Sequence, residues 1–216
     1  MSIEHKEIAA IREDYAKSSL IESDVLHDPI QQFKKWFDEA ISSQVTEPTA
    51  MVLSTVNEKG FPSSRVVLLK DIKSEGLSFF TNYNSRKGQE ILQNPHVSIL
   101  FFWPELQRQV RFEANVEKLS KEDSDEYFAS RPRGSQIGAI ASPQSVIIPN
   151  RESLEKRVAE VELEMGDLAI PRPEFWGGFL IKPVRVEFWQ GRSSRLHDRI
   201  VYILENDIWT INRLAP

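Results

Sequence analysis

The 216-residue sequence predicts a mainly β fold, an antiparallel barrel with peripheral helices (α+β). Three observations predict it. From Thr49 to the C-terminus, short β-branched and aromatic runs recur between turn residues. Residues 108–119 alternate strictly between apolar and polar side chains, which is typical of a half-exposed antiparallel strand. The paired glycines Gly177 and Gly178 permit the sharp bend that barrels use at corners.

Composition limits the class of protein. The formal net charge of −5 argues against a general nucleic-acid binder, which is usually basic. No apolar run approaches the roughly 20 residues of a membrane helix, and the N-terminus lacks the apolar core of a signal peptide, so a cytoplasmic protein is expected. The chain has no cysteine and its four histidines are scattered, so no metal site is predicted.

The first 27 residues are polar and charged, and we expect a flexible N-terminal segment. Its apolar residues recur at helix-like intervals, which predicts a short helix. Arg12 and Tyr15 are three apart and would share one face of that helix, either as part of a lid or as a solvated turn. Residues 28–216 are expected to form a single domain.

A structural helix is predicted to follow. Asp28 is suited to cap it, and Pro29 is suited to its first position. The apolar stripe that would pack on the core consists of Ile30, Phe33, Trp36, Phe37, Ala40 and Ile41.

Two strands come next. Residues 49–56 are β-branched and apolar, residues 57–60 form a turn, and residues 65–70 are predicted to form a strand that is buried on both faces. Two cations, Arg65 and Lys70, bracket this second strand. They either extend to solvent at the strand ends or reach into sites at the rims of the sheet.

A third strand at residues 77–81 leads into a short helix at residues 86–93, whose first turn carries the wrong charge for a helix start. Ser85 is a good N-cap, but Arg86 and Lys87 lie where the helix dipole favours negative groups. A bound phosphate would accept the free backbone N–H groups and pair with both side chains. The alternative is a basic surface turn.

A second cationic site is predicted where one helix ends and another begins. The helix after residue 120 must end near Arg131, because Pro132 follows it. Tyr127, Arg131 and Ser135 are spaced by four, and together they form a candidate phosphate cradle. Two such sites indicate a phosphorylated cofactor and a phosphorylated substrate.

The C-terminal part carries a pattern of charge. Arg195, His197 and Arg199 occur at every second residue, so in an extended chain all three point to one side. That face either binds an anionic or electron-rich partner or is an ordinary charged strand edge. The remaining predicted elements are strands at residues 96–103 and 108–119, a helix from Asn150 to Gly166, a strand region over residues 175–189, and a hairpin of residues 199–204 and 208–212.

These motifs carry a family resemblance. The run from Val186 to Gly191, followed by Arg195-Leu196-His197-Asp198-Arg199, closely resembles the C-terminal signature of pyridoxine/pyridoxamine 5′-phosphate oxidases. The resemblance spans nearly the whole chain from Arg12 onward. Further blocks that look like the family are Arg65–Lys70, Phe80–Asn82, Ser85–Lys87, Arg108–Val110, Ser130–Arg133, Ser135–Gly138, Phe175–Gly178 and Arg213–Pro216.

The resemblance implies an FMN-binding split β-barrel, a homodimer with FMN at the subunit interface. Phe80 departs from the family pattern, because family members also have a tyrosine at this position. Phenylalanine has no hydroxyl group, so the one contact that a tyrosine hydroxyl would make is in doubt. The implied FMN contacts are Arg65, Val66, Val67, Leu68, Lys70, Phe80, Thr81, Arg86, Lys87, Gln109, Gln144, Ser145, Trp189 and Arg199. The implied substrate contacts are Arg12, Tyr15, Lys70, Tyr127, Arg131, Ser135, Arg195 and His197.

The implied activity is the oxidation of pyridoxamine and pyridoxine 5′-phosphate to pyridoxal 5′-phosphate, an activity of vitamin B6 metabolism. Hydride would pass from substrate C4′ to flavin N5, and O2 would accept the electrons and give H2O2. Arg195 and His197 are the implied catalytic residues, because they would hold the substrate ring in position to react. Two alternatives stay open: an FMN-dependent reductase with a nicotinamide or deazaflavin donor, and a non-catalytic module that binds flavin or pyridoxal phosphate.

Overall fold

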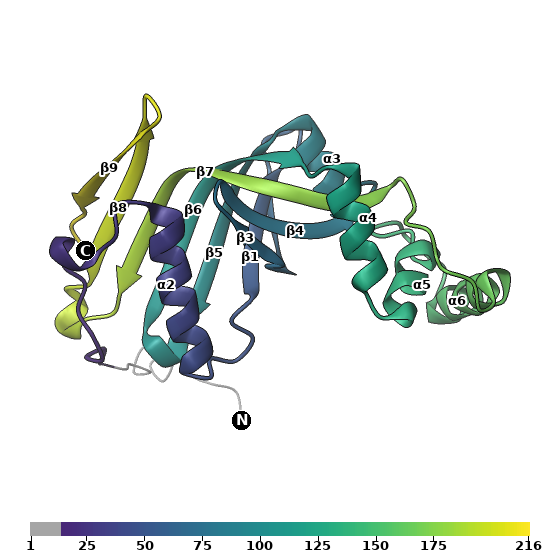
Figure 1. The fold of residues 1–216 in the computed structure, drawn as a ribbon, viewed down its shortest axis with the longest axis horizontal. Helices are drawn as coiled ribbons and strands as arrows, with labels where there is room; N and C mark the ends of the chain where they lie inside the picture. The colour runs from purple at the N-terminus through teal and green to yellow at the C-terminus, as the bar shows by residue number, and fades with distance from the viewer. Residues whose placement is uncertain (1–13) are drawn as a thin grey trace. The chain divides into compact units, whose positions relative to one another are not determined.

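The computed structural model describes residues 14–216, which contain nine β-strands and five α-helices (Figure 1). The mainly β fold with peripheral helices is therefore confirmed. The helices are α2 (Pro29–Ser42), α3 (Arg86–Gln93), α4 (Lys121–Ser130), α5 (Arg133–Ala141) and α6 (Arg151–Met165). The strands are β1 (Ala50–Val56), β2 (Pro62–Leu68), β3 (Asp71–Lys73), β4 (Gly76–Asn82), β5 (His96–Trp103), β6 (Arg108–Lys118), β7 (Trp176–Gln190), β8 (Asp198–Glu205) and β9 (Ile208–Arg213).

The strands follow one another in the order β2-β1-β5-β6-β7-β4-β3, and β8 pairs with β7 and β9. The pairs β1–β2, β3–β4, β4–β7, β7–β8 and β8–β9 are antiparallel. Two features of the register matter for the site. Arg65 on β2 lies opposite Leu53 on β1, and Phe80 on β4 lies opposite Gly178 on β7.

The described residues form two compact units. The terminal unit comprises the described residues up to Pro48, together with Leu100–Phe112 and Arg185–Pro216. The central unit comprises Thr49–Ile99 and Glu113–Val184. None of the helices within residues 14–216 has the length and apolar character that crossing a membrane requires.

In the central unit, helices α4, α5 and α6 share a small apolar core. Helices α5 and α6 lie side by side (Figure 1). Two of the three helices begin with a side-chain cap: the Ser120 side chain caps α4, and Asn150 caps α6 by accepting from the Ser153 N–H at 2.9 Å. The buried residues of this core are Phe128, Ile137, Ala141, Val161, Ile170 and Trp176.

The prediction that the strand at residues 65–70 is buried on both faces was wrong. Strand β2 ends at Leu68, and its exposure alternates along its length. Val66 is 63% exposed and Leu68 is 41% exposed, whereas Leu69 beyond the strand is buried. Apolar side chains of β2 are therefore accessible on the surface of the central unit.

In the terminal unit, α2 begins as predicted. The Asp28 side chain accepts the Gln31 N–H at 2.8 Å, and Pro29 occupies the first turn. Phe33 is fully buried, with its ring 4.9 Å from that of Phe101. Ile41 does not belong to this stripe, because it is 52% exposed near the end of the helix.

The structure corrects two expectations near the ends of the chain. Arg12 lies outside the described residues, and residues 14–20 are not helical, so the predicted N-terminal helix does not reach Tyr15. Arg195, His197 and Arg199 do not share one extended strand either. Arg195 lies in a short turn, Ser193–Arg195, with a left-handed φ of 60°, and β8 begins only at Asp198.

Candidate functional site

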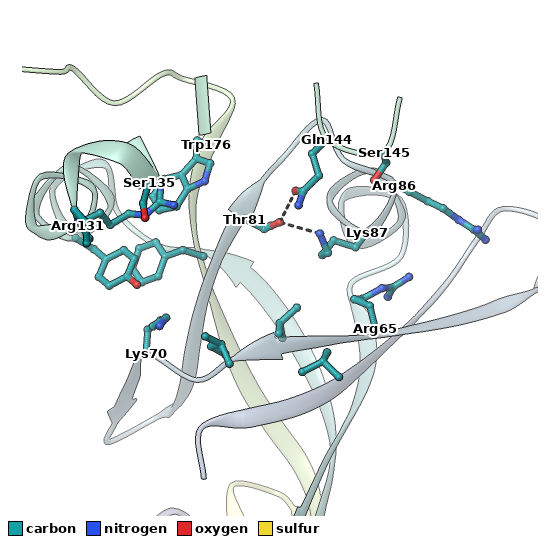
Figure 2. Close-up of a pocket in the computed structure, with 16 residues that line it drawn as sticks. Arg65, Lys70, Thr81, Arg86, Lys87, Arg131, Ser135, Gln144, Ser145 and Trp176 are labelled. Carbon is teal, nitrogen blue, oxygen red and sulfur yellow. Dashed lines mark hydrogen bonds between the residues drawn. The ribbon is translucent and has the colours of Figure 1, made fainter. Parts of the chain in front are cut away.

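A cavity of about 750 Å³ opens in the central unit (Figure 2). It is lined from β2, β4, the first turn of α3, the junction between α4 and α5, and the loop that follows α5. All but two of its lining residues, Pro132 and Trp176, are among those predicted from the sequence to contact a ligand. The predicted residues that it gathers are Arg65, Val66, Val67, Leu68, Lys70, Phe80, Thr81, Arg86, Lys87, Tyr127, Arg131, Ser135, Gln144 and Ser145.

The first turn of α3 forms one end of this cavity. Ser85 is its N-cap, and the Ser85 side chain accepts the Gly88 N–H at 3.2 Å. Arg86 and Lys87 follow as the first helical residues, and both line the cavity. The positive end of the helix dipole and two cationic side chains thus converge where an anion would accept backbone N–H groups.

Lys87 is held in place by a short chain of hydrogen bonds. Its Nζ donates to Thr81 Oγ1 at 3.1 Å, and Thr81 Oγ1 donates to Gln144 Oε1 at 3.2 Å (Figure 2). Burial and the positive charge of Arg65 lower the pKa of Lys87. A neighbouring anion would relieve both effects, because it would stabilise the charged ammonium group.

The other end of the cavity lies at the α4–α5 junction. Figure 2 shows Arg131, Ser135 and Trp176 together there, away from Arg65, Arg86 and Lys87. The guanidinium of Arg131 lies 4.5 Å from the centre of the Trp176 ring, within cation–π range. Burial lowers the pKa of Arg131.

Arg131 is an incompletely satisfied cation. Its Nη1 atom is buried and has no hydrogen-bond partner within the described chain. An unpaired buried charged donor is costly, so a ligand atom that accepted from it would stabilise this end of the cavity. Tyr127 and Ser135 line the same end of the cavity and offer hydroxyl donors to the same acceptor.

An aromatic stack forms part of the cavity wall at the Arg131 end. The Phe80 ring lies 3.8 Å from the Tyr127 ring with an interplanar angle of 19°. Trp176 continues the stack, with its ring nearly parallel to both. The rings fix the direction from which Tyr127 presents its hydroxyl group.

The lining residues include five cations and no carboxylate. Lys70, just beyond β2, is one of them, and its exposed side chain has no partner among residues 14–216. A cavity with this excess of positive charge is suited to a ligand set with at least two anionic groups. The five cations are Arg65, Lys70, Arg86, Lys87 and Arg131.

The remaining predicted residues that the structure describes belong to the terminal unit, where three of them are in contact. The His197 ring lies 4.5 Å from the Trp189 ring, and the Tyr15 ring lies 5.9 Å from Trp189 and 6.0 Å from His197. A Cβ atom on Gly191 would approach the Cβ of Tyr15 at 2.9 Å, so glycine lets the segment before α2 pack closely here. Gln109 lies on β6 and is half-buried.

Arg199 is fixed by a buried carboxylate. Its Nε donates to Glu187 Oε1 at 2.8 Å, and Arg111 Nη2 donates to the other oxygen of Glu187 at 2.5 Å. Glu187 is 4% exposed, and its bond to Arg199 raises the pKa of that arginine. Arg199 therefore has a defined orientation before any ligand binds.

Sequence reasoning missed two residues of the central unit that matter for the cavity. Trp176 contacts Arg131, and its signal was its position in the Phe175–Gly178 block. Glu90 contacts Arg86 on α3, and its signal was the spacing of four residues between a glutamate and an arginine on one helix.

Comparisons with known proteins identify the family of this chain. Residues 37–164 match the family model described as pyridoxamine 5′-phosphate oxidase. Residues 176–216 match the model described as the pyridoxine 5′-phosphate oxidase C-terminal dimerisation region. A pyridoxine/pyridoxamine 5′-phosphate oxidase from Herminiimonas arsenicoxydans is 54% identical over 210 residues, which cover 97% of this chain and 99% of that protein.

Solved structures are similar as well. PhzG from Burkholderia lata 383, in complex with tetrahydrophenazine-1-carboxylic acid, has a TM-score of 0.87 at 32% identity, covering 92% of this chain and 98% of that one. A pyridoxamine 5′-phosphate oxidase-related, FMN binding protein from Nostoc punctiforme PCC 73102 has a TM-score of 0.69, covering 85% of this chain and 97% of that one. At 16% identity the second likeness concerns the fold alone, and it confirms the predicted split-barrel class.

Proposed function

Since this chain belongs to the pyridoxamine 5′-phosphate oxidase family, we propose that it oxidises pyridoxamine 5′-phosphate and pyridoxine 5′-phosphate to pyridoxal 5′-phosphate with FMN as its cofactor. One observation carries the proposal: a single cavity has separate cationic ends, and the Arg131 end holds a buried, unsatisfied guanidinium nitrogen. This is the arrangement that a phosphorylated cofactor and a phosphorylated substrate require.

The residues of the α3 end fit the phosphate of FMN. Arg86 and Lys87 would pair with its oxygens, and the N–H groups of the first helical turn would donate to them. The apolar side chains of Val66 and Leu68 are accessible on β2 and line the same cavity, so they offer a surface for the flat flavin ring.

At the other end, Tyr127, Arg131 and Ser135 would bind the phosphate of the substrate. Lys70 also lines the cavity, and its positive charge would attract the bound anions. Bound FMN would accept hydride from C4′ and pass the electrons to O2, which gives H2O2. The imine formed from the amine substrate is then hydrolysed to the aldehyde, whereas the alcohol substrate gives the aldehyde directly.

We assign Arg195 to the face of the pyridine ring and His197 to its phenolic oxygen. Because His197 Nδ1 already accepts a backbone N–H, its Nε2 is free to donate to that oxygen. In this assignment His197 orients the substrate and does not take a proton from it.

A second proposal concerns where FMN binds in the homodimer. We propose that FMN lies at the subunit interface, with Gln109, Trp189 and Arg199 supplied by the partner subunit. The description of the C-terminal match as a dimerisation region supports an interface formed by residues 176–216.

Subunit complementation tests the interface. Lys87→Met and Arg199→Met each weaken FMN binding when present in both subunits of a dimer. If the two residues serve one FMN from different subunits, a mixed dimer of the two variants contains one intact site and regains FMN binding. If both residues come from the same subunit, each site of the mixed dimer is defective, and no binding returns.

The decisive experiment for the activity is to purify the protein, look for bound yellow flavin, and follow oxygen consumption with pyridoxamine 5′-phosphate. Turnover with O2 separates this proposal from a binding module, and turnover without a nicotinamide or deazaflavin donor separates it from a reductase. Tetrahydrophenazine-1-carboxylic acid is the informative competitor, because it has no phosphate for Arg131 to bind. Oxidation of that compound in preference to the phosphorylated amine would overturn the substrate assignment.

A further inference from the structure

Glu90 is a buried carboxylate behind the α3 end of the cavity, and it is only 4% exposed. Its Oε1 accepts from Arg86 Nε at 2.8 Å, and its Oε2 accepts from Ser63 Oγ at 2.9 Å and from Thr55 Oγ1. Arg65 Nη2 lies 3.6 Å from the same Oε2. One carboxylate thus connects an arginine of β2 with an arginine of α3.

The hydroxyl groups around Glu90 extend this connection. Arg65 Nη1 donates to Thr55 Oγ1 at 2.6 Å and to the carbonyl oxygen of Leu53 at 3.2 Å. The Thr55 hydroxyl in turn donates to Glu90. Arg65 is therefore fixed by direct attraction to Glu90 and by a hydroxyl relay that ends on the same carboxylate.

Glu90 is charged at neutral pH. Burial alone would raise the pKa of its carboxyl group, but hydrogen bonds from Thr55, Arg86 and Ser63 outweigh that effect and lower the pKa below its ordinary value. The anion lies against two cations, the side chains of Arg65 and Arg86, and the charge of Arg65 in turn acts on Lys87. The three cations and the carboxylate together carry a charge of +2, which balances the −2 charge of a phosphate monoester dianion.

We infer that Glu90 is a positioning residue for phosphate recognition: it holds Arg65 and Arg86 at the α3 end of the cavity, which both side chains line. Arg86 uses only its Nε for Glu90, which leaves both of its terminal nitrogens for a ligand. This inference rests on the proposed function, because it takes the phosphate of FMN as the ligand. Without the carboxylate, three like charges would face one another, and the two guanidinium groups would move apart.

The test compares two flavins that differ by one phosphate. Apo-protein is titrated with FMN and with riboflavin, and flavin fluorescence gives both dissociation constants. Glu90→Ala is expected to weaken FMN binding about 10- to 100-fold, the effect of losing one charged hydrogen bond, and to leave riboflavin binding within about 3-fold. Glu90→Gln keeps an acceptor for Arg86 but removes the charge, so its loss of FMN affinity is expected to be smaller.

The control is Glu155→Ala on α6. Glu155 accepts from Arg151 at the same spacing of four residues, at 2.6 Å, but on an exposed helix face. It should leave the ratio of FMN to riboflavin affinity unchanged. Thermal unfolding of each apo-variant shows whether the protein is folded, and Glu90→Gln serves as the test variant if Glu90→Ala is not.

The outcomes separate two failures. If the Glu90 variants lose FMN and riboflavin affinity equally, or lose neither, Glu90 is a packing residue and the inference is overturned, even if the wild type oxidises pyridoxamine 5′-phosphate. A wild type without a preference for FMN over riboflavin overturns it as well. If the FMN-specific loss appears but the wild type does not oxidise pyridoxamine 5′-phosphate, the inference stands and the proposed function fails.

Discussion

The backbone N–H of Arg192 donates to Nδ1 of His197 at 3.1 Å. A ring nitrogen that accepts a hydrogen bond carries no proton, so the neutral ring has its proton on Nε2. Burial and the nearby charge of Arg195 act in the same direction, because both lower the pKa of His197. The loop before β8 therefore prepares a neutral imidazole that donates through Nε2.

The first prediction is that His197 stays neutral throughout the neutral pH range. Its pKa in the folded protein should lie below the ordinary value of 6.5, so it takes up a proton only at lower pH. The unfolded chain binds that proton near the ordinary value, so this group lowers the stability of the fold as pH falls below about 6.5. An NMR titration, with the His197 signal identified by its loss in His197→Asn, checks this. A midpoint at or above 6.5 would contradict it.

The second prediction concerns Arg195, which the left-handed turn presents on an exposed loop. Arg195→Met should reduce turnover of pyridoxamine 5′-phosphate by about 100-fold or more, because the substrate ring loses the group that aligns it. FMN content should stay close to that of the wild type. Arg195→Lys keeps the positive charge but lacks the planar guanidinium group, so it separates the contribution of the charge from that of the planar geometry. Unchanged turnover in Arg195→Met would remove Arg195 from the reaction.

The third prediction concerns substrate phosphate. Arg131→Ala should weaken binding of pyridoxamine 5′-phosphate by about 1.5–3 kcal/mol, the range for a charged hydrogen bond, and it should raise KM more than it lowers kcat. Arg133→Ala is the matched control two residues away, because Arg133 donates to the carbonyl oxygens of Leu168 and Gly166 and does not line the cavity. Steady-state measurements of KM and kcat for both variants test this prediction. An unchanged KM in Arg131→Ala would mean that the substrate phosphate binds elsewhere.

Local signals in the sequence were enough to place the α3 end of the cavity. The helix was predicted at residues 86–93, which are its bounds in the structure, because Ser85 caps its start and Pro95 follows its end. The wrong-sign charges in its first turn pointed to an anion without any knowledge of the fold. Both signals depend on neighbouring residues alone, which is why they could be read in advance.

The features that depend on tertiary structure were not predicted. The apolar pattern placed Val66 inside the sheet, and only the family resemblance implied a ligand contact, whereas its exposed side chain lines the cavity. Alternation predicted one face for Arg195 and His197, yet positive φ at Ser194 and Arg195 breaks the strand. Glu90 was passed over because its importance comes from Arg65, which is 25 residues away in sequence and adjacent only in the fold.

The last prediction is that Gly88 sets the position of the α3 end of the cavity. A Cβ atom there would lie 2.3 Å from the carbonyl oxygen of Tyr83 and 2.8 Å from that of Asn82, and backbone atoms cannot easily move aside. Gly88→Ala should therefore destabilise the fold by about 1–3 kcal/mol and displace the helical turn that carries Arg86 and Lys87, so FMN binding should weaken with it.

Gly138→Ala is the matched control for this substitution. Gly138 also lies in a helix, α5, but a Cβ atom there would meet nothing within 4 Å. Alanine lowers the conformational entropy of the unfolded chain, so this variant should gain about 0.5–1 kcal/mol. Denaturant unfolding and FMN titration of both variants give the comparison. If Gly88→Ala matched Gly138→Ala in stability and FMN affinity, the close approach of α3 to the end of β4 would not be what positions the two cations.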